Sequence, residues 1–102
     1  METLGNLLRE LREQRNLLIR EVAASLSLDQ TLLSKIERDE RKPTQEQLDL
    51  FCKFYKNATD EIQTLYLSDK IMKELKDHKL ADRALDMAKK KLQIKKIKFK
   101  RI

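Results

Sequence analysis

The sequence contains very few of the residues on which most catalytic sites, metal sites and disulfide frameworks depend. Glycine, proline, cysteine and histidine each occur once among 102 residues, and aromatic residues make up 5%. A single glycine excludes a glycine-rich phosphate loop. One cysteine and one histidine exclude a disulfide within the chain and a His/Cys metal site built from a single chain. The carboxylates alternate with lysine and arginine, as on solvated faces, so we expect no enzyme, no metal and no cofactor.

Long apolar runs are also missing. No stretch approaches the roughly 20 apolar residues that span a membrane, and the amino-terminal residues do not follow a signal-peptide pattern. These absences predict a cytoplasmic protein. Cys52 lies in an apolar helical pattern and is expected in the core, as are Met72 and Met87.

Charge is distributed unevenly along the chain, whose formal net charge is +6. Residues 89–102 hold eight lysine and arginine residues and no acidic residue. The other 88 residues hold 15 basic and 17 acidic residues, a balance of −2. The basic end is consistent both with a solvated tail and with an arm for nucleic acid.

Leucine, lysine and glutamate dominate, and β-branched runs with turn dipeptides are absent, which predicts an all-α fold. Apolar spacing and capping residues predict helices over residues 3–15 and 19–26, a third from Asp29 to Arg38, a fourth capped by Thr44, a fifth capped by Asn57 or Thr59, and a last one after Asp77. The apolar phase shifts near residues 68–69, which predicts a break or kink there. Residues 94–102 are consistent with frayed helix, disorder or an edge strand.

Two short helices joined by a tight turn, the second of them polar on its outward side, are typical of a helix-turn-helix. Amide, hydroxyl and ammonium groups can read base edges in the major groove, and the second helix offers Gln30, Thr31, Ser34 and Lys35. Cations and a helix start that can contact phosphates follow, at Arg38, Arg41, Lys42, Thr44 and Gln45. The alternative is that these are ordinary surface residues.

Residues 4–66 resemble the Cro/C1-type (XRE) helix-turn-helix family. The resemblance rests on LRELREQRNLL and EVAASLSLDQTLLSKIERDERKPT, and SKIERDERKP is its most specific part. It implies a lambda-repressor-like five-helix domain over residues 1–67, followed by a C-terminal helical extension over residues 68–102. It also implies double-stranded DNA as the partner, base reading by the four polar residues named above, and a structural ion pair between Arg12 and Glu37.

Three positions depart from the family pattern. Leu18-Ile19 stands where the family often has Thr-Gln at the start of the second helix, and Arg20 is the candidate substitute for the lost phosphate contact. Ser27 replaces the turn glycine. Asp39 replaces the glycine after the reader helix and tolerates left-handed geometry better than most residues.

The resemblance implies a sequence-specific transcriptional regulator, a repressor or controller, that binds a pseudo-palindromic operator as a homodimer. Leu50 and Phe54 form a second apolar line on the fourth helix, expected either to pair two copies or to be buried within one. The C-terminal segment resembles extensions of regulators associated with restriction-modification systems. The alternatives are an antitoxin that binds a toxin and represses its own operon, and a non-specific nucleic-acid packager that uses the lysine-rich tail.

Overall fold

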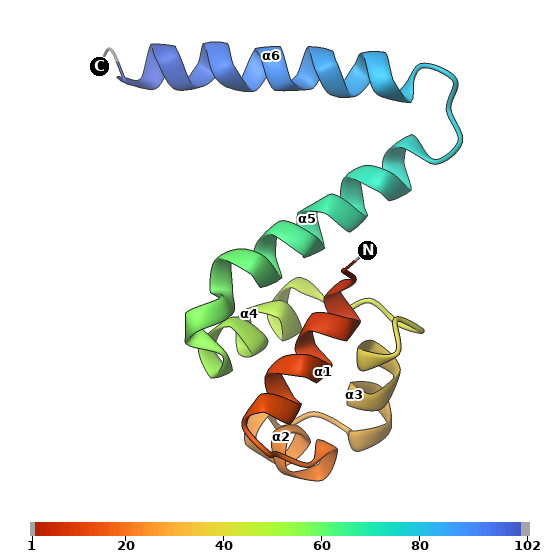
Figure 1. Ribbon diagram of the computed structural model, residues 1–102, viewed down its shortest axis with the longest axis vertical. Helices are drawn as coiled ribbons and strands as arrows, with labels where there is room; N and C mark the ends of the chain where they lie inside the picture. Colours follow the sequence, from red (N-terminus) through yellow and green to blue (C-terminus); the bar gives the residue numbers. More distant parts are fainter. Residues whose placement is uncertain (1, 101–102) are drawn as a thin grey trace. The chain divides into compact units, whose positions relative to one another are not determined.

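The computed structural model describes residues 2–100, with side chains through residue 97. The elements are α1 (Leu4–Gln14), α2 (Ile19–Leu26), α3 (Gln30–Glu37), α4 (Gln45–Phe54), the 3₁₀ turn η1 (Lys56–Ala58), α5 (Thr59–Leu75) and α6 (Ala81–Lys100) (Figure 1). Within these residues every regular element is helical, so the predicted all-α, lambda-repressor-like fold is confirmed.

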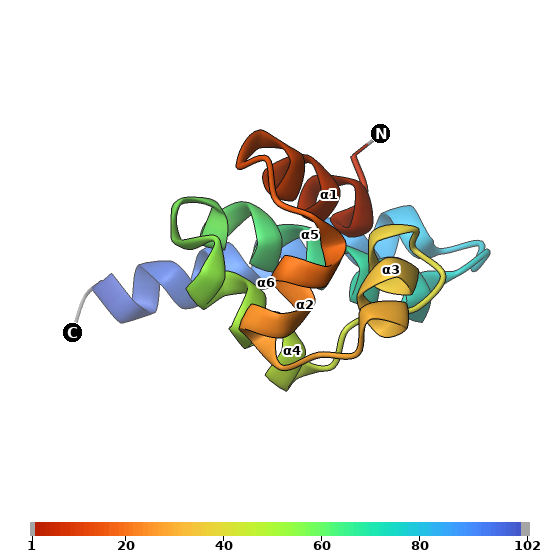
Figure 2. The ribbon, with the colours of Figure 1, turned by 90° about the horizontal axis from the view of Figure 1, so that it is seen from below.

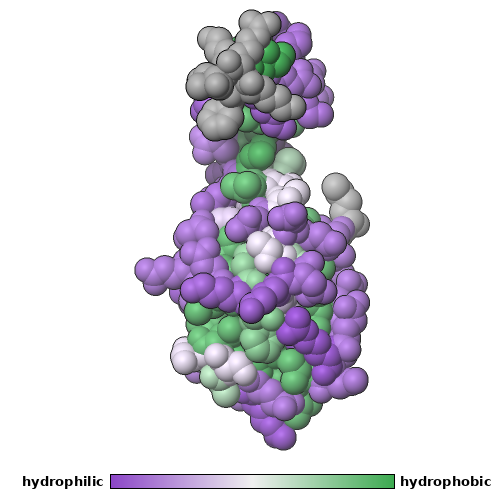
Figure 3. Space-filling view, turned by 90° about the vertical axis from the view of Figure 1, so that its left-hand side faces the viewer, coloured by the Kyte–Doolittle hydropathy of each residue, from purple (hydrophilic) through white to green (hydrophobic). Residues whose placement is uncertain are grey.

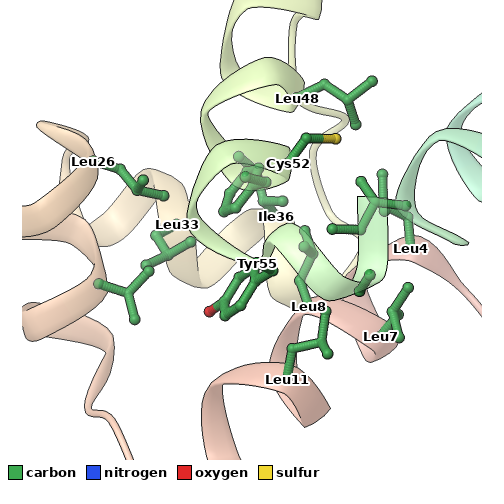
Figure 4. Packing of buried hydrophobic residues seen from close by; sticks show 14 of the residues in the cluster. Leu4, Leu7, Leu8, Leu11, Leu26, Leu33, Ile36, Leu48, Cys52 and Tyr55 are labelled. Atoms are coloured by element: carbon green, nitrogen blue, oxygen red, sulfur yellow. The ribbon is translucent and has the colours of Figure 1, made fainter. Parts of the chain in front are cut away.

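The chain divides into two compact units, one ending at Asp69 and one beginning at Lys70. The first unit is built around the apolar stripes of its helices. Tyr55 lies in the middle of this packing, between leucines of α1 and residues of α2 and α3 (Figure 4). The core consists of Leu4, Leu7, Leu8, Leu11, Val22, Ala23, Leu26, Leu33, Ile36, Leu48, Phe51, Cys52, Tyr55, Ala58, Ile62 and Tyr66. Cys52 is a core residue, as the apolar pattern predicts.

Polar side chains fix where the helices begin. Thr3 accepts a hydrogen bond from the backbone N–H of Asn6 at the start of α1. Thr44, the predicted cap of α4, forms a capping box with Gln47, in which each side chain accepts a hydrogen bond from the other's backbone N–H. These caps satisfy backbone donors that a helix leaves without an intrahelical partner.

Helix ends turn through left-handed backbone conformations without glycine. Within residues 2–100, positive φ values occur at Asn16 (55°), Ser27 (54°), Asp39 (58°) and Lys76 (44°), and the glycine is not among them. Ser27 makes the turn between α2 and α3, and Asp39 makes the turn after α3. Both positions carry a side chain where the family pattern has glycine, and both keep the geometry that glycine favours.

The predicted break near residues 68–69 is wrong, because α5 runs without interruption from Thr59 to Leu75. The shift in apolar phase has another cause. Ile62 and Tyr66 face the core of the first unit, whereas Leu67 and Ile71, further along the helix, are exposed. The helix therefore continues after its buried face has ended.

The second unit contains the end of α5 and all of α6. Residues 94–100, whose sequence is consistent with frayed helix, disorder or an edge strand, belong to α6, whereas residues 101–102 lie outside the described residues. The predicted core positions of Met72 and Met87 are wrong, since both side chains are more than half exposed. No helix in the described part of the chain is long and apolar enough to cross a membrane. Figure 3 shows apolar residues among the hydrophilic ones on the face that it displays.

Candidate nucleic-acid interface

Helix α3, the predicted recognition helix, begins at a capping residue that the sequence predicts. The carboxylate of Asp29 accepts a hydrogen bond from the backbone N–H of Leu32 at 3.1 Å. Leu33 and Ile36 are buried, and α3 packs against α1 and α2, as its place beside α2 in Figure 2 illustrates. The amphipathic pattern therefore fixes which side of α3 faces inward.

The four candidate base-reading residues lie away from the core. Gln30, Thr31 and Lys35 are exposed, and Ser34 is half-buried. Together they present an amide, two hydroxyls and an ammonium group along one short helix. These groups supply the donors and acceptors that can distinguish base edges in the major groove.

Arg12 on α1 and Glu37 at the end of α3 form a nearly buried, two-point ion pair. The Arg12 Nε lies 2.9 Å from Glu37 Oε2, and its Nη2 donates to Oε1 at 3.0 Å. The Arg12 Nη1 also donates to the backbone carbonyl of Leu17 at 2.9 Å. The side chains are 12% and 4% exposed, respectively. The hydrogen bond to Glu37 raises the pKa of Arg12, against the opposing effect of burial.

A second contact ties the other end of α1 to the residues after α3. The Asp39 carboxylate accepts a hydrogen bond from the Thr3 hydroxyl at 2.6 Å and another from the backbone N–H of Gly5 at 3.0 Å. A Cβ added at Gly5 would lie 2.5 Å from the Ile36 carbonyl oxygen and 2.7 Å from that of Glu37. Glycine is therefore required at this position because α1 and the end of α3 approach each other closely. The Arg12–Glu37 pair and the Asp39 contacts join the two helices at two points along α1.

Tyr55 is fully buried and is close enough to the ion pair to interact electrostatically with both of its members. Its hydroxyl has no hydrogen-bond partner among the described residues. Burial raises the pKa of Tyr55 to about 12, with a smaller contribution from the negative charge of Glu37, while Arg12 and Arg15 act in the opposite direction. The core thus contains a polar group that is kept neutral.

Arg15 makes a contact that sequence reasoning did not predict. Its Nη1 donates to the backbone carbonyl of Phe54 at 3.0 Å, and its guanidinium lies 5.5 Å from the centre of the Phe54 ring and 5.0 Å from that of Tyr55. The two rings meet edge-on at 4.9 Å. Phe54 and Leu50, the candidate dimer residues, are half-buried and pack against the core of their own chain.

The candidate phosphate-binding residues differ in how far they are already engaged. Arg38 forms an exposed ion pair with Glu40, with Nη2 and Oε2 at 2.9 Å, and phosphate must compete with that carboxylate. The Gln45 amide donates to Asp49 at 3.1 Å, and Thr44 caps α4. Arg20, Arg41 and Lys42 are exposed. The residues after the carboxyl end of α3 therefore include two exposed cations, Arg41 and Lys42.

A family model described as helix-turn-helix, HTH_3, matches residues 8–62. That segment begins within α1, contains α2 to α4 and reaches the start of α5, and it includes the Arg12–Glu37 pair and the outward face of α3. No curated protein and no solved structure matches the chain significantly. The match covers more than half of the 102 residues, and it agrees with the fold and with the exposed polar face of α3. The chain belongs to the Cro/C1-type helix-turn-helix family and is a DNA-binding regulator.

Proposed function

We propose that this protein is a sequence-specific transcriptional regulator, a repressor or controller, that inserts α3 into the major groove of an operator. The observation that carries the proposal is the orientation of α3. Its polar residues point outward, while Glu37 at its end is held from behind by Arg12 with an Nε–Oε2 distance of 2.9 Å. A reader helix needs such a fixed orientation, because base-specific hydrogen bonds depend on distance and angle.

In this proposal the reading of bases and the contacts to phosphates are separate. Gln30, Thr31, Ser34 and Lys35 contact base edges. Arg20, Arg38, Arg41, Lys42, Thr44 and Gln45 contact the backbone. Base contacts supply the sequence preference, and phosphate contacts supply register and salt-dependent affinity.

Selection of bound fragments from random DNA, first with the parent protein and then with the Lys35→Ala variant, tests the proposal. If Lys35 reads a base, the variant should lose about 1–3 kcal/mol of preference at one half-site position and keep the rest of the site. Lys53→Ala is the matched control, because Lys53 is an exposed lysine on α4 that the proposal does not use. Equal binding of selected and scrambled duplexes by the parent protein would refute sequence-specific reading.

We further propose that the regulator acts as a homodimer on a pseudo-palindromic site. A single α3 of eight residues contacts only a few base pairs, and two-fold pairing places two such helices about one DNA turn apart. Leu50 and Phe54 keep part of their apolar surface exposed and are candidate contact residues. Sedimentation of the full chain measures this directly, and a strict monomer at micromolar concentration would overturn the dimer.

A second candidate function is that of an antitoxin. The observation that favours it is the set of exposed apolar side chains in the C-terminal unit, which a toxin could cover. A toxin-like gene beside this one would favour the antitoxin, whereas a methyltransferase or nuclease gene would favour a restriction-linked controller.

A further inference from the structure

The C-terminal unit has apolar side chains but no core of its own among its described residues. From residue 70 to residue 97 no side chain is buried. Seven large apolar side chains there are about half exposed: Ile71, Met72, Leu80, Met87, Leu92, Ile94 and Ile97. Four of the seven, Met87, Leu92, Ile94 and Ile97, lie on α6. Most helical stability in proteins comes from packing of an apolar face, so we expect another surface to cover part of α6.

One face of α6 has the spacing of a helix-pairing surface. Ala81, Leu85, Ala88 and Leu92 recur at intervals of four, three and four residues, as in the core positions of a coiled coil. Ala81 and Leu85 are half-buried, whereas Ala88 is exposed and Leu92 is 58% exposed. We call these four residues the α6 seam. Small and large residues alternate along it.

That alternation fits a second copy of α6 that runs in the opposite direction. In an antiparallel pair, Leu92 of one copy lies opposite Ala81 of the other, and Leu85 lies opposite Ala88. Each leucine then fills the space above an alanine. Interdigitation of large and small side chains gives the packing density of protein interiors.

A parallel pair is opposed by the lysines beside the seam. Lys91 on one flank would face Lys96 of the second copy, since the flanking positions of parallel helices meet five residues apart. Both lysines are exposed, and a parallel dimer would contain two such contacts between like charges. The parallel pair would also place leucine on leucine and alanine on alanine, leaving thin layers at the alanines.

Charge favours the antiparallel pair. In the same register, Asp82 on the flank of one copy lies beside Lys89 of the other, so the dimer gains two pairs of opposite charge. Residues 93–100, which hold lysines and no acidic residue, extend beyond the overlap at opposite ends. The antiparallel arrangement therefore keeps the two basic ends of the dimer apart.

We infer that α6 pairs with α6 of a second copy of this chain, antiparallel, through the α6 seam. This inference rests on the proposed homodimer and names its contact surface. The arrangement is two-fold symmetric and closes on itself, as is usual for homodimers. The seam spans 12 residues, about 17 Å of helix, so the pair is a small interface.

Sedimentation equilibrium of the full chain tests the apolar part of the inference. Leu92→Ser should weaken dimerisation by about tenfold or more, as expected for a buried contact residue. Met87→Ser is the matched control, because Met87 is 53% exposed on α6 but lies on another face, and it should leave the dissociation constant within about threefold. Equal effects of the two variants would overturn the seam.

Charge reversal tests the direction of the pair. Asp82→Lys and Lys89→Asp should each weaken the dimer, and the double variant should restore it, because each reversed charge again meets its opposite. Lys90→Asp, on the face away from the seam, is the control and should have no such effect. A double variant weaker than both single variants would overturn the antiparallel register.

The outcomes also separate this inference from the proposed homodimer. A parent protein that stays monomeric at micromolar concentration overturns both. A dimer that ignores every α6 variant but dissociates on Phe54→Lys overturns only the α6 seam.

Discussion

Replacing Arg12 by alanine would leave the Glu37 carboxylate, which is 4% exposed, without its cation. The substitution removes three guanidinium–carboxylate hydrogen bonds and the bond to the Leu17 carbonyl. Breaking a buried pair from one side costs about 3–5 kcal/mol, because the remaining charge has lost its compensation. The free energy of unfolding of small domains is only about 5–15 kcal/mol, so Arg12→Ala should remove a large part of the stability of the first unit.

Arg9→Ala is the matched control on the same helix. Arg9 and Glu13 also form an arginine–glutamate pair, with Nε and Oε1 at 3.0 Å, but the side chains are 59% and 53% exposed. An exposed pair of this spacing contributes about 0.3–0.5 kcal/mol. The two substitutions should therefore differ by about 2.5 kcal/mol or more, although both remove one arginine from α1.

Urea unfolding followed by tyrosine fluorescence measures this difference. The chain has two tyrosines and no tryptophan, and both tyrosines lie in the first unit, so the signal reports on that unit. The double variant Arg12→Met/Glu37→Met should recover much of the loss, since apolar residues replace a buried ion pair at little cost. A loss below about 1 kcal/mol for Arg12→Ala, or one equal to that of Arg9→Ala, would refute the reasoning.

Two further substitutions test the core and the helix contact. Tyr55→Phe removes a buried hydroxyl that lacks a partner and should leave stability at pH 7 unchanged or raise it by up to about 1 kcal/mol. The pKa of Tyr55 is raised from 10.0 to about 12, so the protonated form is favoured in the folded state. Stability should be unaffected below pH 10 and fall as the pH rises toward 12, and the difference from Tyr55→Phe, measured by urea unfolding at each pH, isolates this effect. A constant difference across that range would contradict it. Gly5→Ala would place a Cβ against the Ile36 carbonyl and should cost about 1–3 kcal/mol in the same assay, while a neutral result would show that α1 can shift away from α3.

The sequence predicts the local features of this fold well. The caps at Asp29 and Thr44, the start of α2 and the outward face of α3 depend on residues within a few positions of one another. Such short-range patterns predict the structure correctly because tertiary packing favours the same helix starts and the same buried faces. Asp39, at a position where the family pattern has glycine, adopts the left-handed geometry that it tolerates better than most residues.

Contacts between distant residues could not be predicted in the same way. The need for glycine at Gly5 arises from carbonyls more than 30 residues away, and the Asp39 carboxylate acts on α1 rather than on its own turn. Arg15 reaches Phe54 across a separation of 39 residues. Nothing in the local sequence around Asp39 and Arg15 distinguishes them from other polar surface residues.

The error at Met72 and Met87 has a related cause. Helical spacing of apolar residues predicts that a face will be covered, but it does not say by which chain. Both residues lie in the C-terminal unit, where no described side chain is buried. The pattern predicts an internal core, whereas in the single chain both methionine side chains are more than half exposed.

Left-handed turns without glycine leave room to strengthen this molecule. At Ser27 and Lys76 a side chain occupies a backbone region that glycine enters without steric penalty, so glycine there should add roughly 0.5–1 kcal/mol each to the free energy of unfolding. Asp39 must be spared, because its carboxylate holds Thr3 and Gly5. Two substitutions, Ser27→Gly and Lys76→Gly, should therefore stabilise the protein and leave every side chain on the outward face of α3 unchanged.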